Sequence, residues 1–329
     1  MNFASIVMMI QKLIVTLEDT YFQKTIYFLE INHTFRYRWF ISYNNYDAMA
    51  SILGVNQNLY LRIADELYLK RLIIGGFDKV YEMSKDFRNE GMDRSHNPEF
   101  TMLEFYWAYA DYQDCMDLVE DMIKVISDNI GSLIIEWDGK NFDLSKPFHR
   151  VPFFELLENE TGYDLRDKKN SELKEVCIEK GLEVNPNENT GQLLDKLMSE
   201  FVEPKLIEPT FVIDYPKAIS PLAKMHRNGD DRIVERFELF IGGSEFANSF
   251  SELNDPIDQR NRLEEQVERK NKGDQEAHPI DESFLQAMEC GMPPTGGVGI
   301  GIDRLTMLLT NNRWIKDVIL FPALRPESE

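Results

Sequence analysis

The sequence predicts an α+β fold, because its strands come in hairpin pairs and helices do not follow every strand. Residues 79–87 and 99–109 alternate apolar and polar side chains on either side of a polar loop, which predicts one hairpin. Residues 234–241 and 244–253 alternate on either side of Gly242-Gly243, a two-residue turn signal, which predicts a second hairpin. The predicted helices lie outside these two pairs.

Three helices are predicted from capping residues and composition. Asp65 is suited to begin a helix over residues 66–74, and Gly75-Gly76 is suited to end it. Residues 111–130 predict a longer helix. Residues 256–275 predict a heavily charged helix whose charges form a solvated face.

Two regions fit no simple pattern. Residues 1–56 are aromatic-rich and match no single period, so we separate them as an atypical N-terminal segment. Residues 135–205 mix Lys, Glu and Asn with short apolar runs, and we predict an inserted helical subregion there.

Composition excludes several classes of protein. The chain of 329 residues has 36 basic and 57 acidic side chains, a net charge of −21, so a nucleic-acid partner would need a local basic patch or a further domain. Cys115, Cys177 and Cys290 form no CxxC pair, which argues against a disulfide framework and fits a reducing compartment. The apolar stretch at residues 4–17 is shorter than the roughly 20 residues of a membrane span. We therefore expect a soluble, cytoplasmic protein with no membrane partner.

The first hairpin carries chemically informative side chains. In its loop, Arg88 offers a planar fork to a phosphate or carboxylate, and Glu90 can accept from an amine. On its second strand, period two places Phe100, Glu104 and Tyr106 on one face, so a carboxylate and a phenol share that face with an aromatic ring. A surface turn beside a half-exposed polar face is the alternative interpretation.

The second hairpin carries two carboxylates across its turn. Glu238 and Glu245 would repel each other unless a divalent cation or a cationic ligand lay between them, and Mg²⁺ bound to phosphate oxygens suits such a pair. Two solvated acids are the alternative. Period two assigns four further residues to one face of the second strand: Phe246, Asn248, Phe250 and Glu252.

A strand of alternating glycines follows later in the chain. Gly297, Gly299 and Gly301 leave one face of this strand without side chains, which indicates close approach by a flat ligand such as adenine or by another chain. A helix is predicted at residues 303–309, and Arg304 in its first turn can stack on a ring or hold a phosphate. The run matches neither a Walker loop nor a Rossmann fingerprint.

These runs resemble the class II aminoacyl-tRNA synthetases over about residues 57–327. Residues 87–91 (FRNEG) and 96–101 (HNPEFT) resemble motif 2, and residues 297–305 (GVGIGIDRL) resemble motif 3. The lysyl-tRNA synthetase family in particular is similar at residues 59–64 (LYLRIA), 66–71 (ELYLKR) and 251–256 (SELNDP). The resemblance implies a catalytic domain at residues 57–329, with an antiparallel sheet flanked by helices and commonly a homodimer.

The resemblance also implies an activity and a set of site residues. The expected reaction is the ATP- and Mg²⁺-dependent activation of L-lysine to lysyl-adenylate, followed by transfer to the acceptor end of tRNA(Lys). Arg88 and Arg304 are the implied catalytic residues, and Glu238 and Glu245 the implied metal ligands. The implied ATP-binding residues are Arg88, Glu90, His96, Asn97, Phe100, Glu238, Glu245, Gly299, Gly301 and Arg304. The implied lysine-binding residues are Glu66, Arg88, Glu104, Tyr106, Asn248, Phe250 and Glu252.

The chain departs from that family at its N-terminus. No anticodon-binding domain precedes the similar region, and motif 1 is not legible, because Asn32-His33 stand where a Thr-Pro pair is expected. We hypothesise a truncated or frameshifted N-terminus, with a natural variant as the alternative.

Two other functions stay open at this point. One is a tRNA-independent lysyltransferase that acts on a protein, as a synthetase-like enzyme does on elongation factor P; Gly299 and the run at residues 251–256 argue against it. The other is a truncated, inactive synthetase-like module, against which the presence of Arg88 and Arg304 argues.

Overall fold

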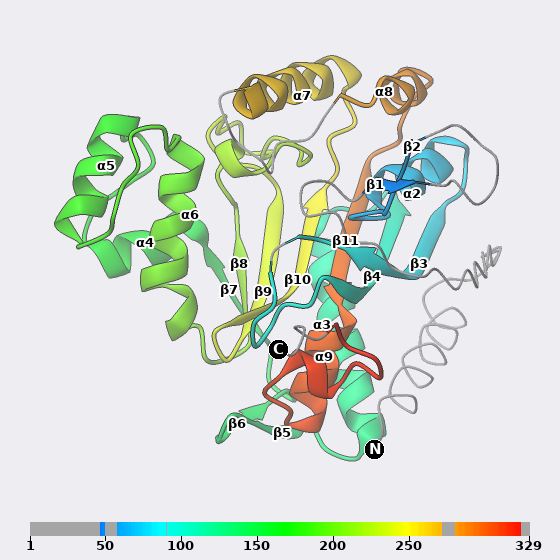
Figure 1. Cartoon of the computed structure of the whole chain (residues 1–329), viewed down its shortest axis with the longest axis vertical. Coiled ribbons are helices and arrows are strands. Elements are labelled where there is room, and N and C mark those ends of the chain that lie inside the picture. The colour runs from blue at the N-terminus through cyan, green and yellow to red at the C-terminus, as the bar shows by residue number, and fades with distance from the viewer. Residues whose placement is uncertain (1–46, 50–57, 90, 272–279, 324–329) are drawn as a thin grey trace.

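A seven-stranded sheet forms the centre of the molecule. The computed structural model describes residues 47–49, 58–89, 91–271 and 280–323. Neighbouring strands of the sheet are antiparallel except β7 and β8, which are parallel. The order across the sheet is β3 (Lys79–Phe87), β4 (Glu99–Ala108), β11 (Thr295–Gly301), β10 (Ser244–Ser251), β9 (Arg236–Ile241), β8 (Thr210–Ile213) and β7 (His149–Pro152). The predicted α+β class, with an antiparallel sheet flanked by helices, is confirmed (Figure 1).

Helices and two small hairpins surround this sheet. The small hairpins are β1 (Asp47–Met49) with β2 (Asn58–Tyr60) and β5 (Ile134–Trp137) with β6 (Lys140–Asp143). The α-helices are α2 (Glu66–Ile74), α3 (Tyr112–Ile130), α4 (Phe153–Thr161), α5 (Asn170–Glu179), α6 (Thr190–Phe201), α7 (Pro256–Asn271), α8 (Glu282–Glu289) and α9 (Ile302–Thr310). Short 3₁₀ turns lie at Glu203–Lys205, Lys217–Ile219 and Ile315–Asp317.

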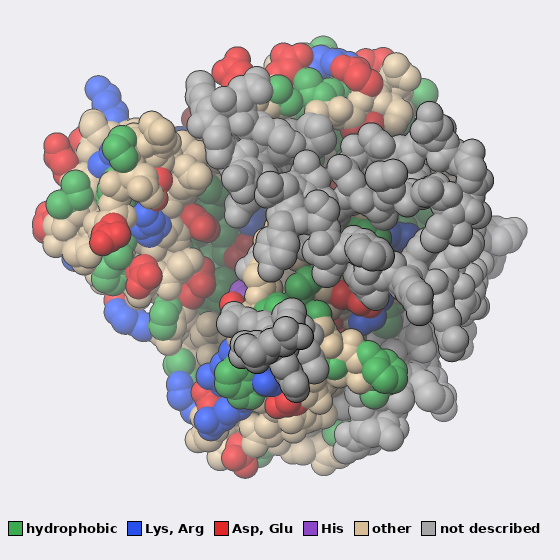
Figure 2. Space-filling view, in the orientation of Figure 1, with side chains coloured by type: hydrophobic (Ala, Val, Ile, Leu, Met, Phe, Trp, Pro, Cys, Tyr) green, Lys and Arg blue, Asp and Glu red, His purple; other side chains and the backbone are tan. Residues whose placement is uncertain are grey.

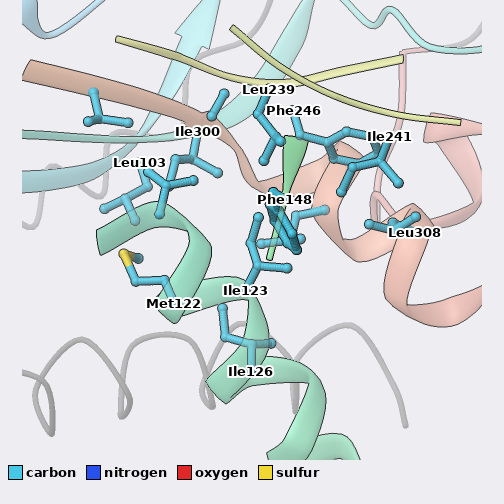
Figure 3. Close-up of a cluster of buried hydrophobic side chains, with 14 of the residues drawn as sticks. Leu103, Met122, Ile123, Ile126, Phe148, Leu239, Ile241, Phe246, Ile300 and Leu308 are labelled. Carbon is cyan, nitrogen blue, oxygen red and sulfur yellow. The ribbon is translucent and has the colours of Figure 1, made fainter. Parts of the chain in front are cut away.

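One face of the sheet is fully covered. Leu103, Leu239 and Ile300 project from β4, β9 and β11 into one buried apolar cluster with Ile123 of α3 (Figure 3). Helix α3 begins at Asp111, whose side chain accepts from the backbone N–H groups of Gln113 and Asp114. This layer, with α9 beside it, holds the largest buried core of the described residues.

Among the described residues, helices cover the opposite face at its two edges. At one edge Leu69 of α2 packs against Val80 of β3. At the other edge Phe240 of β9 is buried with Phe153 of α4 and Leu193 of α6. Figure 1 shows α4–α6 beside β7–β9 and α2 beside β3 and β4, at the two ends of the strand order. In the part of the chain that the structure describes, the central strands β4, β11 and β10 therefore present an uncovered face between these helices.

The predicted hairpins and helices lie within a few residues of the observed elements. The helix at residues 66–74 and the strand at residues 79–87 are confirmed to the residue. The strand predicted to end at Tyr109 ends at Ala108, because Tyr109 takes a positive φ of 64° and donates its N–H to the carbonyl of Pro294. Its side chain is 78% exposed.

The predicted N-cap of α2 forms differently from the expectation. The Asp65 side chain makes no capping bond. It is fully buried and accepts instead from Arg62 and from Ser84 on β3. Asp65 therefore ties the helix to the sheet rather than to its own first turn.

The region at residues 135–205 is helical only in part. Its helices run from Phe153 to Phe201, whereas residues 134–152 contain the strands β5, β6 and β7. Alternating Ile135 and Trp137 point into the main core, which is the pattern of a strand. Trp137 stacks edge-on against Phe246 at a ring distance of 5.8 Å.

The charged helix α7 has the predicted solvated face. Figure 2 shows acidic and basic side chains interspersed on α7 at the top of the view. Its inner side buries Leu263 and Arg262, and the Arg262 side chain donates to the carbonyls of Ser220 and Ala223. No helix in the part of the chain that the structure describes is long and apolar enough to span a membrane. Most of the atypical segment at residues 1–56, motif 1 included, lies outside the described residues.

Candidate active site

A cavity of about 310 Å³ lies on the uncovered face of the sheet. Its floor is made by β4, β11 and β10, and its walls come from the start of α2, the loop after β3 and the start of α9. The predicted site residues that line it are Glu66, Arg88, His96, Asn97, Phe100, Glu104, Tyr106, Glu245, Asn248, Phe250, Glu252, Gly299, Gly301 and Arg304. Two predicted residues are not among them: Glu238 lies beside the cavity on β9, and Glu90 lies outside the described residues.

The alternating glycines of β11 make a floor of bare backbone. A Cβ atom on Gly299 would meet its nearest neighbour, Met102 Sδ, only at 3.8 Å, so open space lies above this residue. A Cβ on Gly297 would come within 2.0 Å of Glu252 Oε1 and 2.5 Å of Tyr106 Cε1. The floor thus has an open part and a part where polar side chains lie directly on the backbone.

A β-bulge decides which residues of β10 face the cavity. Opposite β9, Glu245 pairs with Phe240 while Ala247 pairs with Leu239, so Phe246 is the extra residue. The bulge shifts the alternation by one, which places Glu245 on the same face as Asn248. Strict alternation would have turned Glu245 toward the core.

The prediction that Phe246 shares the face of Asn248 is therefore wrong. Phe246 is 2% exposed and packs in the core with Trp137 (Figure 3). The sequence carries no glycine or proline that marks the bulge, so period two alone gave the wrong face for this residue.

One end of the cavity gathers buried carboxylates. Glu104 is 5% exposed and accepts a hydrogen bond from the Tyr106 hydroxyl at 3.1 Å. Burial, reinforced by the neighbouring charges of Glu66, Asp65 and Asp86, raises the pKa of Glu104 to about 8. Burial and the Glu104 carboxylate raise the pKa of Tyr106, which keeps this phenol a hydrogen-bond donor.

Glu252 completes this acidic end and carries an unused oxygen. The residue is 1% exposed, and its Oε2 lies 2.5 Å from Lys70 Nζ. Its Oε1 is buried without a hydrogen-bond partner among the described residues. Burial raises the pKa of Glu252, and the Lys70 ammonium opposes that rise. A buried carboxylate oxygen without a donor is costly, so this oxygen is suited to receive a cationic group.

The other end of the cavity is lined by arginines. Arg88 stacks over the Phe100 ring at 5.2 Å and donates through Nε to the carbonyl of Ile63. Arg304 donates through Nη1 to the carbonyl of Glu245 at 3.0 Å, and its Nη2 lies 3.0 Å from His96 Nε2. This end is suited to anionic groups such as a phosphate or a carboxylate.

Most of the chain matches one family of known proteins. Residues 39–325 match the family described as tRNA synthetases class II (D, K and N). The chain belongs to this family. The resemblance of the chain to the class II aminoacyl-tRNA synthetases is thereby confirmed.

Within the class II synthetases, the chain is similar to curated proteins that share one name. The chain is 53% identical over 277 residues to a protein of Pelotomaculum thermopropionicum named lysine–tRNA ligase, covering 83% of this chain and 54% of the relative. Proteins of Gloeobacter violaceus and Deinococcus radiodurans with the same name are each 54% identical; they cover 82% and 83% of this chain, and 55% and 52% of their own lengths are matched. The chain spans about half the length of the curated relatives it matches.

Glu238 and Glu245, the predicted magnesium ligands of this class II synthetase, lie on neighbouring strands. Burial and the charge of Glu238 raise the pKa of Glu245, so a cation between the two carboxylates would relieve their repulsion. Carboxylate oxygens are the donors that Mg²⁺ prefers, so the pair fits the ion as two of its ligands. Tyr215 donates to Glu238 at 2.8 Å, and Arg304 lies 3.5 Å from the Glu245 carboxylate. No group of three or more His, Cys, Asp and Glu side chains suited to a metal occurs among the described residues.

Three further residues of the site were missed in the sequence. Lys70 pairs with Glu66 one helical turn before it, a spacing of four that the sequence displays. Asp93 accepts from His96 Nδ1 at 2.8 Å, and an Asp three residues before a His is the visible signal. Asp303 accepts from the backbone N–H of Thr101 at 2.6 Å and so ties α9 to β4. That contact joins residues 202 positions apart, and no local pattern reveals it.

Proposed function

We propose that this chain carries the catalytic domain of a lysine–tRNA ligase, which forms lysyl-adenylate from L-lysine and ATP and passes the lysyl group to tRNA(Lys). One observation carries the proposal: a single cavity joins a group of buried carboxylates to an arginine-lined floor of bare backbone. The names of the relatives support a tRNA acceptor over a protein acceptor.

The acidic end is proposed to select the amino acid. Lysine is a compact cation with three donors on its side chain, and Glu104, Tyr106 and Glu252 offer acceptors for them. Glu66 at the start of α2 would receive the α-ammonium group, while Asn248 and Phe250 line the pocket. A neutral amino acid would leave these carboxylates unpaired, at a cost of roughly 1–3 kcal/mol for each lost contact.

The arginine end is proposed to hold ATP. Phe100 and Arg304 supply the two surfaces between which the adenine stacks, over the open floor at Gly299 and Gly301. His96, Asn97 and Glu90 are proposed as further nucleotide contacts. Glu238 and Glu245 would hold Mg²⁺, which when bound neutralises charge on the phosphates.

The reaction needs no covalent enzyme intermediate. A lysine carboxylate oxygen attacks the α-phosphorus in line, the bond from that phosphorus to the bridging oxygen breaks, and pyrophosphate leaves. Arg88, at the arginine end of the cavity, would pair with both the lysine carboxylate and the α-phosphate as charge develops. A terminal ribose hydroxyl of tRNA then attacks the lysyl carbonyl and AMP leaves.

Two further properties belong to this proposal. We expect the chain to act as a homodimer, which is the usual state of this family. Sedimentation at several protein concentrations measures this oligomeric state. We also expect it in the cytoplasm, since the reaction serves translation.

Lysine-dependent exchange between ATP and pyrophosphate tests the proposal. We expect exchange that requires Mg²⁺ and occurs with L-lysine but not with L-arginine or L-aspartate. Arg88→Ala should abolish it while thermal unfolding stays unchanged, because Arg88 is partly exposed and outside the core. A folded chain without exchange would overturn adenylate formation. Exchange without charging of tRNA(Lys) would point instead to a protein acceptor.

A further inference from the structure

A buried lysine lies directly behind the acidic end of the cavity. The helical period places Lys70 one turn after Glu66 on the same face of α2. The Lys70 side chain has no exposed surface, and its ammonium pairs with Glu66 and, at 2.5 Å, with Glu252 Oε2. Burial alone would lower the pKa of Lys70, but the carboxylates of Glu252 and Glu66 raise it above its usual range, so the ammonium stays charged.

Lys70 pairs with one side of the Glu66 and Glu252 carboxylates, and the other side of each carboxylate faces the cavity. Glu252 Oε2 faces Lys70, while Oε1 has no partner among the described residues. Oε1 lies over the floor of the cavity, since a Cβ on Gly297 would come within 2.0 Å of it. Glu66 also lines the cavity, with 17% of its side chain exposed.

The charges at this end can be counted. Lys70 pairs with Glu66 on its own helix and with Glu252 at the end of β10. Glu104 and Tyr106 on β4 line the same end of the cavity, and the charge of Glu66 acts on both. Asp65 and Asp86 add further negative charge beside Glu104, and Asp65 pairs with Arg62. Arg71 on α2 pairs separately with Asp281, the N-cap of α8. With Glu66, Glu104 and Glu252 all ionised, this end holds three carboxylates and the single ammonium of Lys70, which leaves two negative charges.

That residual charge matches one class of ligand. An amino acid with a second ammonium group brings two positive charges to this end, while its carboxylate pairs with Arg88 under the proposed function. Three carboxylates then face three ammonium groups, one from the protein and two from the ligand. Without the protein's own ammonium, one buried carboxylate would stay unpaired in the complex, which is strongly unfavourable.

We propose that Lys70 is a positioning residue of the amino-acid pocket, which pairs with Glu252 Oε2 so that Oε1 is turned to the cavity, and which sets the residual charge of the pocket to that of a diammonium amino acid. The inference rests on the proposed function, because it takes lysine as the ligand. Lys70 acts through Glu252 and Glu66 and does not itself touch the substrate.

Lys70→Met tests this role through the pH dependence of the KM for lysine. In the wild-type chain this KM should level off above about pH 8, where Glu104 has ionised. In the variant, Glu252 loses its ammonium partner and its pKa rises, so the KM should be about tenfold higher at pH 7 and keep falling toward about pH 9. The KM for ATP should stay unchanged. Lys70→Arg keeps the charge and should keep the wild-type profile.

A matched control comes from a pair of the same spacing on another helix. Lys124 pairs with Glu120 at 2.6 Å on α3, outside the cavity, so Lys124→Met should leave both KM values and the pH profile unchanged. A Lys70→Met variant whose profile matches that of the wild-type chain would overturn the proposal.

If Lys70→Met does not fold, a double variant tests whether Lys70 acts through Glu252. Lys70→Met/Glu252→Gln removes the charge that would be left unpaired, so it should fold and its KM for lysine should match that of Glu252→Gln within about threefold. A double variant that is unfolded, or tenfold weaker than Glu252→Gln, would show that Lys70 does not act through Glu252. If the wild-type chain itself gives no lysine-dependent exchange, the proposed function fails and this inference fails with it.

Discussion

At the scale of single residues, burial separates the roles of similar side chains. Glu66, Glu104 and Glu252 are all carboxylates, but only Glu104 is buried without a cation beside it among the described contacts. Its carboxylate accepts from Tyr106 and from the backbone of Asp65, which are both neutral donors. A ligand ammonium would therefore be the first cation to pair with Glu104, whereas Glu66 and Glu252 already pair with Lys70.

Glu104 predicts a pH dependence for lysine binding. Its pKa is raised to about 8, so below that pH the carboxyl is mostly protonated and an incoming ammonium must displace the proton. We expect the KM for lysine to fall as pH rises from about 6 to about 8, by up to about tenfold per pH unit, and then to level off. Initial-rate exchange assays across this range measure it. Glu104→Gln has no such proton, and a slope that persists in that variant would assign the pH dependence to another group.

Substitutions at Gly297 and Gly299 are expected to affect different substrates. A methyl group there would overlap Glu252 Oε1 and the Tyr106 ring, whereas one at Gly299 would meet Met102 only at 3.8 Å. Gly297→Ala should therefore raise the KM for lysine by about tenfold or more and change the KM for ATP little, since a misplaced charged hydrogen bond costs roughly 1.5–3 kcal/mol. Gly299→Ala should act mainly on the KM for ATP. Equal effects of the two substitutions on both substrates would contradict the division of the cavity.

At the scale of elements, the loop after β3 is ordered by one carboxylate. Asp93 Oδ1 accepts from the backbone N–H groups of Ser95 and His96, and Oδ2 accepts from His96 Nδ1 at 2.8 Å. With Nδ1 carrying the proton, Nε2 is left to accept from Arg304. Asp93 thus orients His96 at the proposed nucleotide end, although Asp93 does not itself line the cavity.

Asp93→Ala is expected to weaken ATP binding selectively. The substitution removes three charge-assisted contacts, each worth roughly 1.5–3 kcal/mol in favourable geometry. The KM for ATP should rise by about tenfold, because the exposed loop recovers part of the loss through water. The KM for lysine should be unchanged. Separate titrations of ATP and lysine measure the two values. A rise in the KM for lysine of the same size would indicate that the whole site is disturbed.

Local sequence patterns predicted some elements correctly and failed at others. Alternation and turn residues predicted both hairpins and the face that Glu104 and Tyr106 share, because those signals lie within one strand. Alternation failed at Phe246, because a bulge depends on the pairing of two strands and leaves no mark in one of them. It also failed to show strands at residues 134–152, where short apolar runs fit helix and strand equally.

At the scale of the whole molecule, one face of the sheet packs in the main core and the other face lines the cavity. Leu239 has no exposed surface and lies in the core beneath α3 (Figure 3). Leu239→Ala should lower the free energy of unfolding by about 2–5 kcal/mol, because it leaves a cavity in a close-packed layer. Urea denaturation measures this, with Ile178→Ala as the control, since Ile178 is 63% exposed and its loss should cost less than about 0.5 kcal/mol. A core that tolerates Leu239→Ala as well as the control would contradict the assignment of α3 as the stabilising layer.

What the sequence determined by itself is which side chains are available to line the cavity. Arg88, Glu104, Glu252, the alternating glycines and Arg304 were identified from their order along single segments, since residue type and spacing within a strand or loop are local properties. The tertiary structure decided how these groups are charged and aimed. Burial, which sets the protonation of Glu104, and the Lys70–Glu252 pair, which joins residues far apart in the chain, arise only when α2 packs on the sheet. Desolvation and long-range pairing depend on which elements meet, and no local pattern of side chains contains that information.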